Sequence, residues 1–145
     1  MILADEKATS AAGQELAKVL RAGDVVTLSG SLSAGKTTFV RGLLAALGHR
    51  GEVPSPSFAI VQPYEGLSPP VWHVDLYRIE LPSDVEELGL DDIGDDGVLI
   101  VEWPEHGERN AWPNALALSL EVMDDGSRSL TARVPAAWEG RWPNP

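Results

Sequence analysis

The sequence predicts an α/β fold, a three-layer sandwich whose mostly parallel central sheet continues into a C-terminal antiparallel hairpin. Three features lead to this prediction. The β-branched run Val25–Ser29 indicates a buried strand, and a glycine-bounded loop and a helical pattern follow it directly. The apolar run Val98–Val101 is typical of a central strand that is covered on both faces. Two segments of alternating apolar residues, 116–122 and 130–134, flank the turn 124–127 and predict the hairpin.

The loop after the first strand carries the most specific motif of the chain. Residues 29–38 are SGSLSAGKTT and satisfy the pattern G-x-x-x-x-G-K-[ST], with Gly30, Gly35, Lys36 and Thr37 at its fixed positions. Backbone N–H groups in such a loop converge on phosphate oxygens, where the dipole of the following helix also favours negative charge. Lys36 would reach the β- and γ-phosphates, and the Thr37 hydroxyl would bind Mg²⁺.

A glycine-rich turn that merely links a strand to a helix is the alternative interpretation. The flanks argue against it, because residues 39–47 place apolar side chains at helical spacing and Gly48 follows as a helix stop. Strand, loop and helix in this order are the context that the motif requires. The sequence therefore predicts a P-loop NTPase-like domain that binds a nucleotide.

The composition limits the class of protein further. With 145 residues the chain forms one domain, 1–145, in which we expect 136–145 to be a loosely held tail. Its net charge of −11 would repel phosphate backbones, so direct nucleic-acid binding by this chain alone is not expected. The absence of cysteine excludes a disulfide framework. The N-terminus has neither a basic segment nor a long apolar run, so we expect a cytoplasmic protein that does not contact a membrane.

The remaining elements follow from local patterns. They are, in order, a helix over 8–20 capped by Thr9 or Ser10, strands over 58–62 and 71–75, and a short helix that begins at the capping box Ser83–Glu86. Pro63 predicts that the strand before it ends there or lies at a sheet edge. His73 alternates with its apolar neighbours, so we expect it to face a sheet surface and assign it no chemistry.

Two acidic residues follow apolar strands, at the positions where a nucleotide site needs carboxylates. Asp75 and Glu102 are each the first acidic residue after such a run. Ligands of a parallel α/β sheet lie beyond the carboxyl ends of its strands, so both would arrive beside Lys36 and Thr37. We expect Thr37 and Glu102 to hold Mg²⁺ and Asp75 to lie near the γ-phosphate or the attacking water, with Lys36, Asp75 and Glu102 as the catalytic group. Alternatively, Asp75 and Glu102 would only cap the ends of their strands.

Trp103 has two possible roles. Trp103, next to Glu102, would pack in the core or contact the nucleotide, and core packing is the expected role.

An Asn-Lys-x-Asp motif that reads guanine is missing, because the chain's lysines are Lys7, Lys18 and Lys36. This favours ATP over GTP.

Together these segments resemble the bacterial TsaE (YjeE) family. The matching pieces are GSLSAGKTTFVR at 30–41, VPSPSFAIVQPY at 53–64, HVDLYR at 73–78, EELG at 86–89 and VLIVEWP at 98–104. The resemblance implies an ATPase that is weak alone and stimulated by partners. Such an ATPase acts in the biosynthesis of threonylcarbamoyladenosine, beside the anticodon of tRNA, with a TsaB–TsaD complex that its hydrolysis of ATP resets.

The resemblance also implies site residues. Phosphate contacts come from Leu32, Ser33, Ala34, Gly35, Lys36, Thr37 and Thr38; Thr37 and Glu102 bind Mg²⁺; Asp75 contacts the nucleotide or its metal; Trp103 lies next to the site; and Glu6, Glu105 and the turn Gly126–Arg128, with Arg128, lie near the nucleotide. Ser31, Ser33 and Ser57 depart from the family's usual Asp, Gly and Thr, which bears on rate and affinity. Of these, Ser57 keeps a hydroxyl that could sense the γ-phosphate, whereas Ser33 places a Cβ where glycine leaves φ free.

Two other functions stay open at the level of sequence. A small P-loop kinase acting on a metabolite would share the motif, although no arginine-rich lid follows it. A nucleotide-dependent interaction module would use ATP binding to control docking, with hydrolysis incidental.

Overall fold

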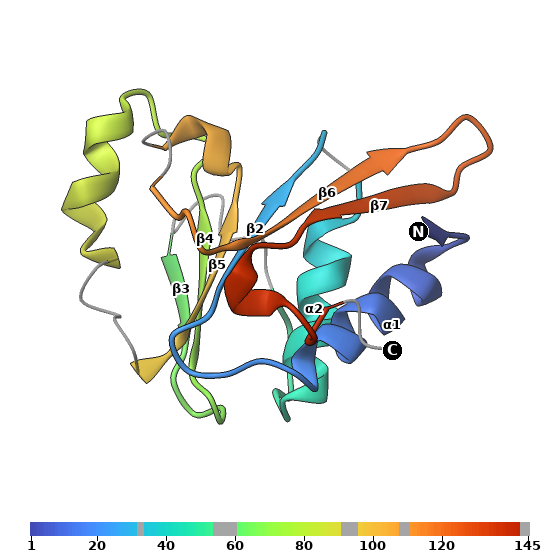
Figure 1. Ribbon diagram of the computed structural model, residues 1–145, viewed down its shortest axis with the longest axis horizontal. Coiled ribbons are helices and arrows are strands. Elements are labelled where there is room, and N and C mark those ends of the chain that lie inside the picture. The colour runs from blue at the N-terminus through green and yellow to red at the C-terminus, as the bar shows by residue number, and fades with distance from the viewer. Residues whose placement is uncertain (32–33, 54–60, 91–95, 108–110, 143–145) are drawn as a thin grey trace.

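The structure is a computed structural model, and it describes residues 1–31, 34–53, 61–90, 96–107 and 111–142. A seven-stranded mixed sheet forms its centre, with strand order β1-β7-β6-β2-β5-β4-β3 (Figure 1). The strands are β1 (Ile2–Leu3), β2 (Val25–Ser29), β3 (Val61–Tyr64), β4 (Val71–Asp75), β5 (Val98–Glu102), β6 (Leu116–Val122) and β7 (Arg128–Arg133). Strands β6, β2, β5 and β4 are parallel neighbours, and β1, β7 and β3 add antiparallel pairs at the two ends. The predicted α/β fold, with its parallel core and C-terminal hairpin, is confirmed.

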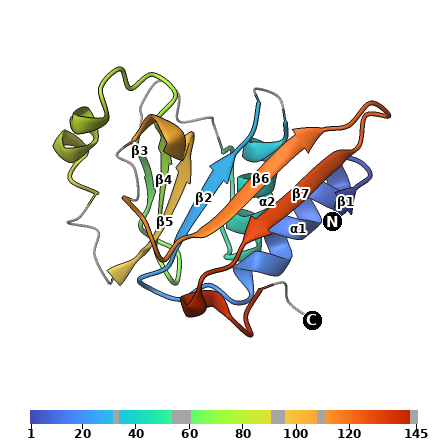
Figure 2. The same ribbon diagram turned by 45° about the horizontal axis from the view of Figure 1, so that its top comes forward.

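Two α-helices cover one face of the sheet. Helices α1 (Glu6–Ala17) and α2 (Lys36–Ala46) lie side by side behind β6, β2 and β7 in Figure 2. They approach closely because Gly13 and Gly42 present no side chain, and a Cβ at either position would lie 2.1–2.2 Å from a carbonyl oxygen of the other helix. This contact fixes the start of α1 beside the start of α2.

The two faces of the sheet carry separate apolar clusters. Alternation along β5 sends Val98 and Ile100 into the cluster under α1 and α2, whereas Leu99 and Val101 join a smaller cluster on the opposite face. Val85, from the 3₁₀ helix η1 (Pro82–Leu88), packs into the smaller cluster. The predicted third layer is thus supplied over β4 and β5 by a 3₁₀ helix and loops.

The first helix differs from the prediction at both ends, since it ends at Ala17 rather than at residue 20. The sequence pattern predicts a helix over 8–20 capped by Thr9 or Ser10, but α1 starts at Glu6 and Asp5 caps it, with Asp5 Oδ1 accepting from the N–H of Ala8 at 2.9 Å. Asp5 has extended backbone angles, which an N-cap requires. At the other helix, Gly48 adopts φ 102° and lets His49 N–H donate to Leu44 O at 2.9 Å, as its role of helix stop predicts.

The edge strands agree with the sequence in kind. Pro63 lies in β3, which is an edge strand paired only to β4, so its missing N–H costs no ladder bond. The strand predicted over 58–62 lies outside the described residues up to position 60, and the described strand runs on to Tyr64.

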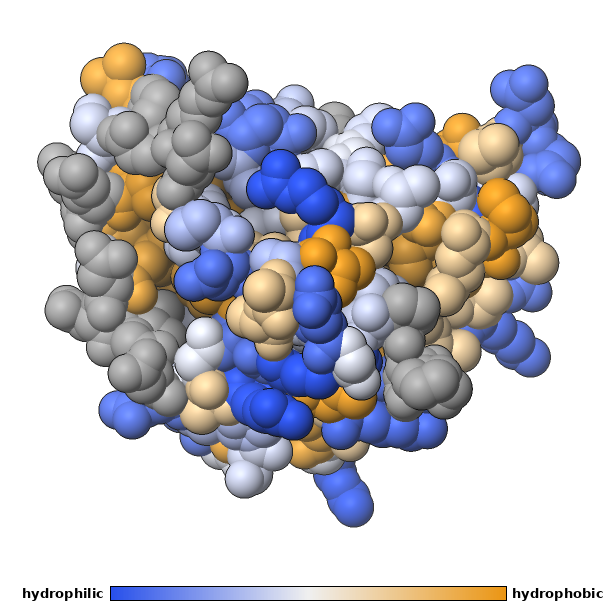
Figure 3. Space-filling view, viewed as in Figure 1, coloured by the Kyte–Doolittle hydropathy of each residue, from blue (hydrophilic) through white to orange (hydrophobic). Residues whose placement is uncertain are grey.

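At the other side of the sheet, the end of the β6–β7 hairpin extends beyond the helices, and Figure 3 shows hydrophobic and hydrophilic residues next to one another there.

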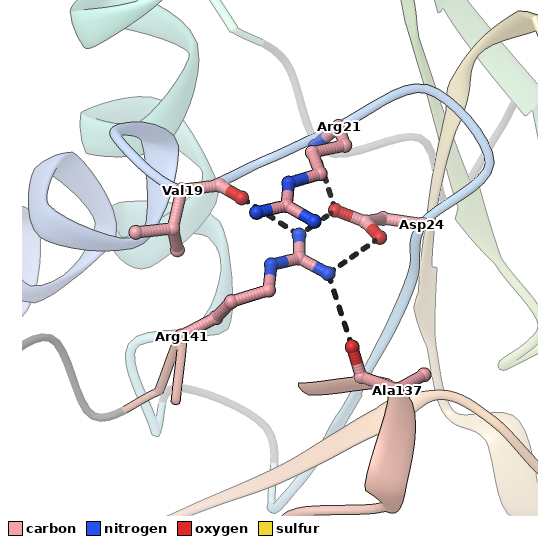
Figure 4. Close-up of polar contacts among 5 residues, drawn as sticks. All are labelled: Val19, Arg21, Asp24, Ala137 and Arg141. Atoms are coloured by element: carbon pink, nitrogen blue, oxygen red, sulfur yellow. Dashed lines mark hydrogen bonds and ion pairs between the residues drawn. The ribbon is translucent and has the colours of Figure 1, made fainter. Parts of the chain in front are cut away.

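The C-terminal segment is packed rather than loosely held. Trp138, in the 3₁₀ helix η5 (Ala136–Trp138), is 1% exposed and belongs to the cluster under α1 and α2. Figure 4 shows Arg141 between the end of α1 and β2, where its guanidinium donates to Val19 O at 2.7 Å and forms an ion pair with Asp24. The prediction of a loose tail is therefore wrong for residues 136–142, while 143–145 lie outside the described residues.

None of the described helices is both long and apolar enough to cross a membrane.

Candidate nucleotide-binding site

A cavity of about 820 Å³ opens where the carboxyl ends of the parallel strands meet the starts of both helices. Four parts of the chain line it. They are the start of α1 (Ala4, Asp5, Glu6 and Thr9), the start of α2 (Gly35, Lys36, Thr37 and Thr38), the strand ends (Asp75, Tyr77, Arg78, Glu102 and Trp103) and the hairpin turn (Gly126 and Arg128). Segments far apart in sequence thus meet at the position where α/β sheets bind ligands.

Two glycines shape the loop between β2 and α2. Gly30 has φ +139°, and a Cβ there would lie 2.1 Å from the carbonyl oxygen of Leu120 on β6. Gly35 has φ +103° and precedes the first turn of α2, which receives no side-chain cap from the described residues. The N–H groups of that first turn, with the helix dipole behind them, therefore favour an anion in the cavity. Leu32 and Ser33, predicted phosphate contacts, lie outside the described residues, as does Ser57.

Lys36 is buried at the first position of α2, directly after this loop. Its Nζ donates to Gly30 O at 2.6 Å and lies 3.7 Å from the centre of the Trp103 ring, and the residue is 5% exposed. Burial lowers the pKa of Lys36, and the carboxylates of Glu102, Asp75 and Glu105 oppose that shift. The ammonium is thus held by a carbonyl and an aromatic face, both of which a phosphate can replace with a stronger ionic bond.

Asp75 and Glu102 lie side by side because β4 and β5 pair in parallel, in a register that places Asp75 opposite Glu102. Asp75 Oδ1 accepts from the N–H of Tyr77 at 2.8 Å, which fixes the turn after β4. Burial raises the pKa of Asp75, and the neighbouring Glu102 raises it as well, whereas the Tyr77 N–H, His73 and Lys36 lower it. The two carboxylates predicted from strand ends do converge beside Lys36.

His73 contacts a predicted site residue, Glu102, although the sequence prediction assigns it no role. It lies on β4 two residues before Asp75, is fully buried, and its Nε2 is 2.5 Å from Glu102 Oε2. The prediction that His73 faces a sheet surface is correct, but that surface also carries Glu102. Its place in the run HVDLYR, two residues before a predicted site acid on the same face of a strand, was the available signal.

Trp103 lines the cavity and packs against the smaller apolar cluster. It adopts left-handed backbone angles, φ 59°, directly after Glu102, and this turns its ring into the cavity under Lys36. Tyr77 and His106 lie against it, with ring centres 4.9 and 5.5 Å away. Trp103 also packs against the smaller apolar cluster, so the expected core packing is confirmed in part, and a place next to the site is what the family resemblance implies.

The other predicted residues divide between the cavity and its surroundings. Glu6, Thr38 and Arg128 line the cavity, and Arg128 Nη1 donates to Gly126 O at 2.6 Å within the hairpin turn. Ala34 is fully buried and Glu105 lines a separate hollow beside Thr27 and Ser29, so neither lines this cavity. Gly126, in the predicted turn Gly126–Arg128, lines the cavity as well, and the cavity residues absent from the prediction are Ala4, Asp5, Thr9, Tyr77 and Arg78.

The oxygen-bearing side chains in the cavity suit a hard divalent cation that also binds phosphate oxygens. Thr37, Asp75 and Glu102 offer oxygen donors in one cavity, and Mg²⁺ prefers oxygen ligands. Within the part of the chain that the structure describes, no three His, Cys, Asp or Glu side chains are placed to hold a metal by themselves. This agrees with Mg²⁺ sites that combine one or two carboxylates with water and phosphate oxygens.

Fold and site together define a P-loop α/β protein. The family model for "Threonylcarbamoyl adenosine biosynthesis protein TsaE" matches residues 3–130. The chain therefore belongs to the TsaE family, and it is a component of tRNA threonylcarbamoyladenosine biosynthesis. The resemblance seen in the motifs is confirmed.

Relatives and a solved structure agree with this assignment. The tRNA threonylcarbamoyladenosine biosynthesis protein TsaE of Streptomyces coelicolor is 54% identical over 112 residues, which are 75% of this chain and 76% of the relative. The protein of the same name from Aquifex aeolicus is 35% identical over 132 residues, 90% of this chain and 92% of the relative. The crystal structure of YdiB from Bacillus subtilis superposes with a TM-score of 0.72 at 29% identity, covering 91% of this chain and 82% of YdiB.

Proposed function

We propose that this chain is a magnesium-dependent ATPase that serves tRNA threonylcarbamoyladenosine biosynthesis. One observation carries the proposal: the last three residues of the G-x-x-x-x-G-K-T motif, Gly35–Thr37, line the same cavity as Asp75 and Glu102. A motif alone would leave the glycine-rich turn as an alternative, but a linker turn has no reason to meet two buried carboxylates. Family membership supports the same conclusion.

Each residue has a role in ATP binding that follows from its place. The first-turn N–H groups of α2 bind phosphate oxygens, and Lys36 leaves Gly30 O for the β- and γ-phosphates. Thr37 and Glu102 hold Mg²⁺, which when bound neutralises charge on the phosphates. Glu6, at the start of α1, and Arg128, on the hairpin, border the cavity where the rest of the nucleotide extends.

Asp75 is placed to take a proton from the attacking water. It is 5% exposed, and the bond from Tyr77 N–H holds one of its oxygens, Oδ1. The raised pKa of Asp75 makes it a stronger base than a solvated carboxylate while it remains ionised. In hydrolysis the water oxygen bonds to the γ-phosphorus, the bond to the β–γ bridging oxygen breaks, and the water proton passes to Asp75.

The substitution Glu102→Gln tests the ATPase. It keeps the shape of the side chain and removes the charge that binds Mg²⁺, so we expect hydrolysis to fall about 100-fold or more. Glu121→Gln is the control, because Glu121 is exposed on β6 outside the cavity. Phosphate release measured with and without Mg²⁺ is the assay. Normal, Mg²⁺-dependent turnover by Glu102→Gln would contradict the assignment.

We further propose that the chain acts with a TsaB–TsaD-like complex, which the family membership suggests and which would stimulate a weak intrinsic activity. A pull-down of that complex by this chain, in ATP and in ADP, tests the partnership. A complex whose amount changes with the nucleotide supports it, and no complex in either nucleotide counts against it. Modification sustained over many cycles by Glu102→Gln would instead favour an interaction module in which hydrolysis is incidental.

A further inference from the structure

The side chain of His73 is unusual because it is polar, fully buried and bonded at only one of its two nitrogens. Nε2 lies 2.5 Å from Glu102 Oε2, while Nδ1 has no hydrogen-bond partner among the described residues. A buried polar atom without a partner lowers stability, and an apolar side chain would fill this position on β4 without that loss. The bond to Glu102 is therefore what the histidine provides.

The unpaired nitrogen also indicates which atom carries the proton. A proton on Nδ1 would be a buried donor without an acceptor, which is costlier than a bare acceptor nitrogen. The tautomer that fits has its hydrogen on Nε2, so His73 donates to Glu102 Oε2. This leaves Oε1 as the carboxylate oxygen for other ligands.

Glu102 needs such a fixed partner because Asp75 lies beside it. The two carboxylates are opposite one another in the β4–β5 register, and His73 is on the same face of β4 as Asp75. Repulsion from Asp75 would turn the Glu102 side chain away from the position in which it holds the cation. The hydrogen bond from His73, two residues before Asp75 on β4, counteracts that movement.

We propose that His73 is a positioning residue for the magnesium ligand Glu102, holding Oε2 so that Oε1 faces the cation. The proposal rests on the proposed Mg²⁺–nucleotide site. Groups that orient metal ligands from outside the coordination sphere typically change metal affinity 10- to 100-fold when they are removed.

Two amide variants separate this role from simple packing. In His73→Gln the side-chain nitrogen lies about where Nε2 was and can still donate to Glu102. In His73→Asn the amide is about as polar but one carbon shorter, and its nitrogen falls short of Glu102. His73→Leu removes the donor and keeps an apolar side chain in the core.

The readout is the Mg²⁺ concentration that gives half-maximal tightening of AMP-PNP binding, together with the AMP-PNP affinity in EDTA. We expect His73→Gln to stay within about threefold of the unsubstituted chain and His73→Asn to need about tenfold more Mg²⁺ or above. The affinity in EDTA should be equal in both, which shows that the fold and the loop are intact. If His73→Leu does not fold, the Gln and Asn pair still decides the question.

Equal Mg²⁺ requirements for His73→Gln and His73→Asn, whether both normal or both raised, would overturn the positioning role. Failure of the unsubstituted chain to bind AMP-PNP more tightly in Mg²⁺ is a different result. It would remove the proposed function itself, and this inference with it.

Discussion

The packed C-terminal segment makes a quantitative prediction about stability. In Arg141→Met a long apolar side chain is retained, but the guanidinium, whose Cζ lies 4.2 Å from the centre of the Trp138 ring, is lost. That guanidinium pairs with Asp24 and donates to Val19 O, and the two charged side chains are 12% and 11% exposed. Exposed ion pairs contribute at most about 1 kcal/mol, whereas breaking a fully buried pair costs about 3–5 kcal/mol. For this nearly buried pair we expect a loss of about 2 kcal/mol.

The measurement is urea unfolding followed by circular dichroism, with thermal unfolding beside it. For a chain of this size a loss of about 2 kcal/mol lowers Tm by about 6–8 °C. Asp24→Asn and the double variant complete a cycle, in which we expect a coupling energy of about 1 kcal/mol between the two side chains. Arg133→Met, an exposed position on β7, is the matched control and should change stability by less than about 0.5 kcal/mol.

The result that refutes this reasoning is equality of Arg141→Met and Arg133→Met. In that case the guanidinium of Arg141 would not anchor the C-terminal segment to the end of α1 and to Asp24. Destabilisation without coupling to Asp24 would instead assign the effect to the other contacts of the guanidinium, with Val19 O, Ala137 O and the Trp138 ring.

The remaining predictions concern the site. Gly30→Ala places a Cβ 2.1 Å from Leu120 O at φ +139°, so unfolding free energy should fall by at least about 2 kcal/mol, while Gly66→Ala, with no atom within 4 Å, should change little; equal losses would contradict the geometry. Lys36→Met removes a charged bond to phosphate, so affinity for AMP-PNP should fall about 10- to 100-fold in a calorimetric titration, and unchanged affinity would remove Lys36 from the site. Asp75 has a raised pKa in the folded state, so that state holds the proton more tightly than the unfolded chain and stability gains as pH falls through this pKa. Asp75→Asn should accordingly unfold at higher urea than the unsubstituted chain at pH 7.5, with the difference shrinking toward pH 4, and a difference that grows on acidification would show the opposite shift.

Much of the fold could be predicted because its signals are local. Val25–Ser29, the G-x-x-x-x-G-K-T loop and Val98–Val101 each encode their structure within a few residues, through β-branching, glycine and apolar runs. Strand ends gave Asp75 and Glu102 as well, because parallel strands bring their carboxyl ends to one edge. These predictions needed only the chain order.

The errors arose where a long-range contact outweighs a local pattern. The composition of 136–142 is typical of a tail, but Trp138 and Arg141 pack against the end of α1 and the start of β2, more than a hundred residues earlier. No local pattern reveals such a partner, because burial depends on what another segment presents. The start of α1 is a different kind of error, because the Asp5 cap is a local feature that the prediction overlooked in favour of Thr9 or Ser10.

The sequence by itself determined a P-loop α/β protein of the TsaE family and the identity of its motif residues, since glycine spacing and apolar periodicity act over short distances. Only the tertiary structure decided that His73 contacts Glu102 and that Trp103 lies under Lys36. Each of these is a contact between side chains on different elements. Its distance is set by strand register and helix packing, which no spacing along the chain specifies.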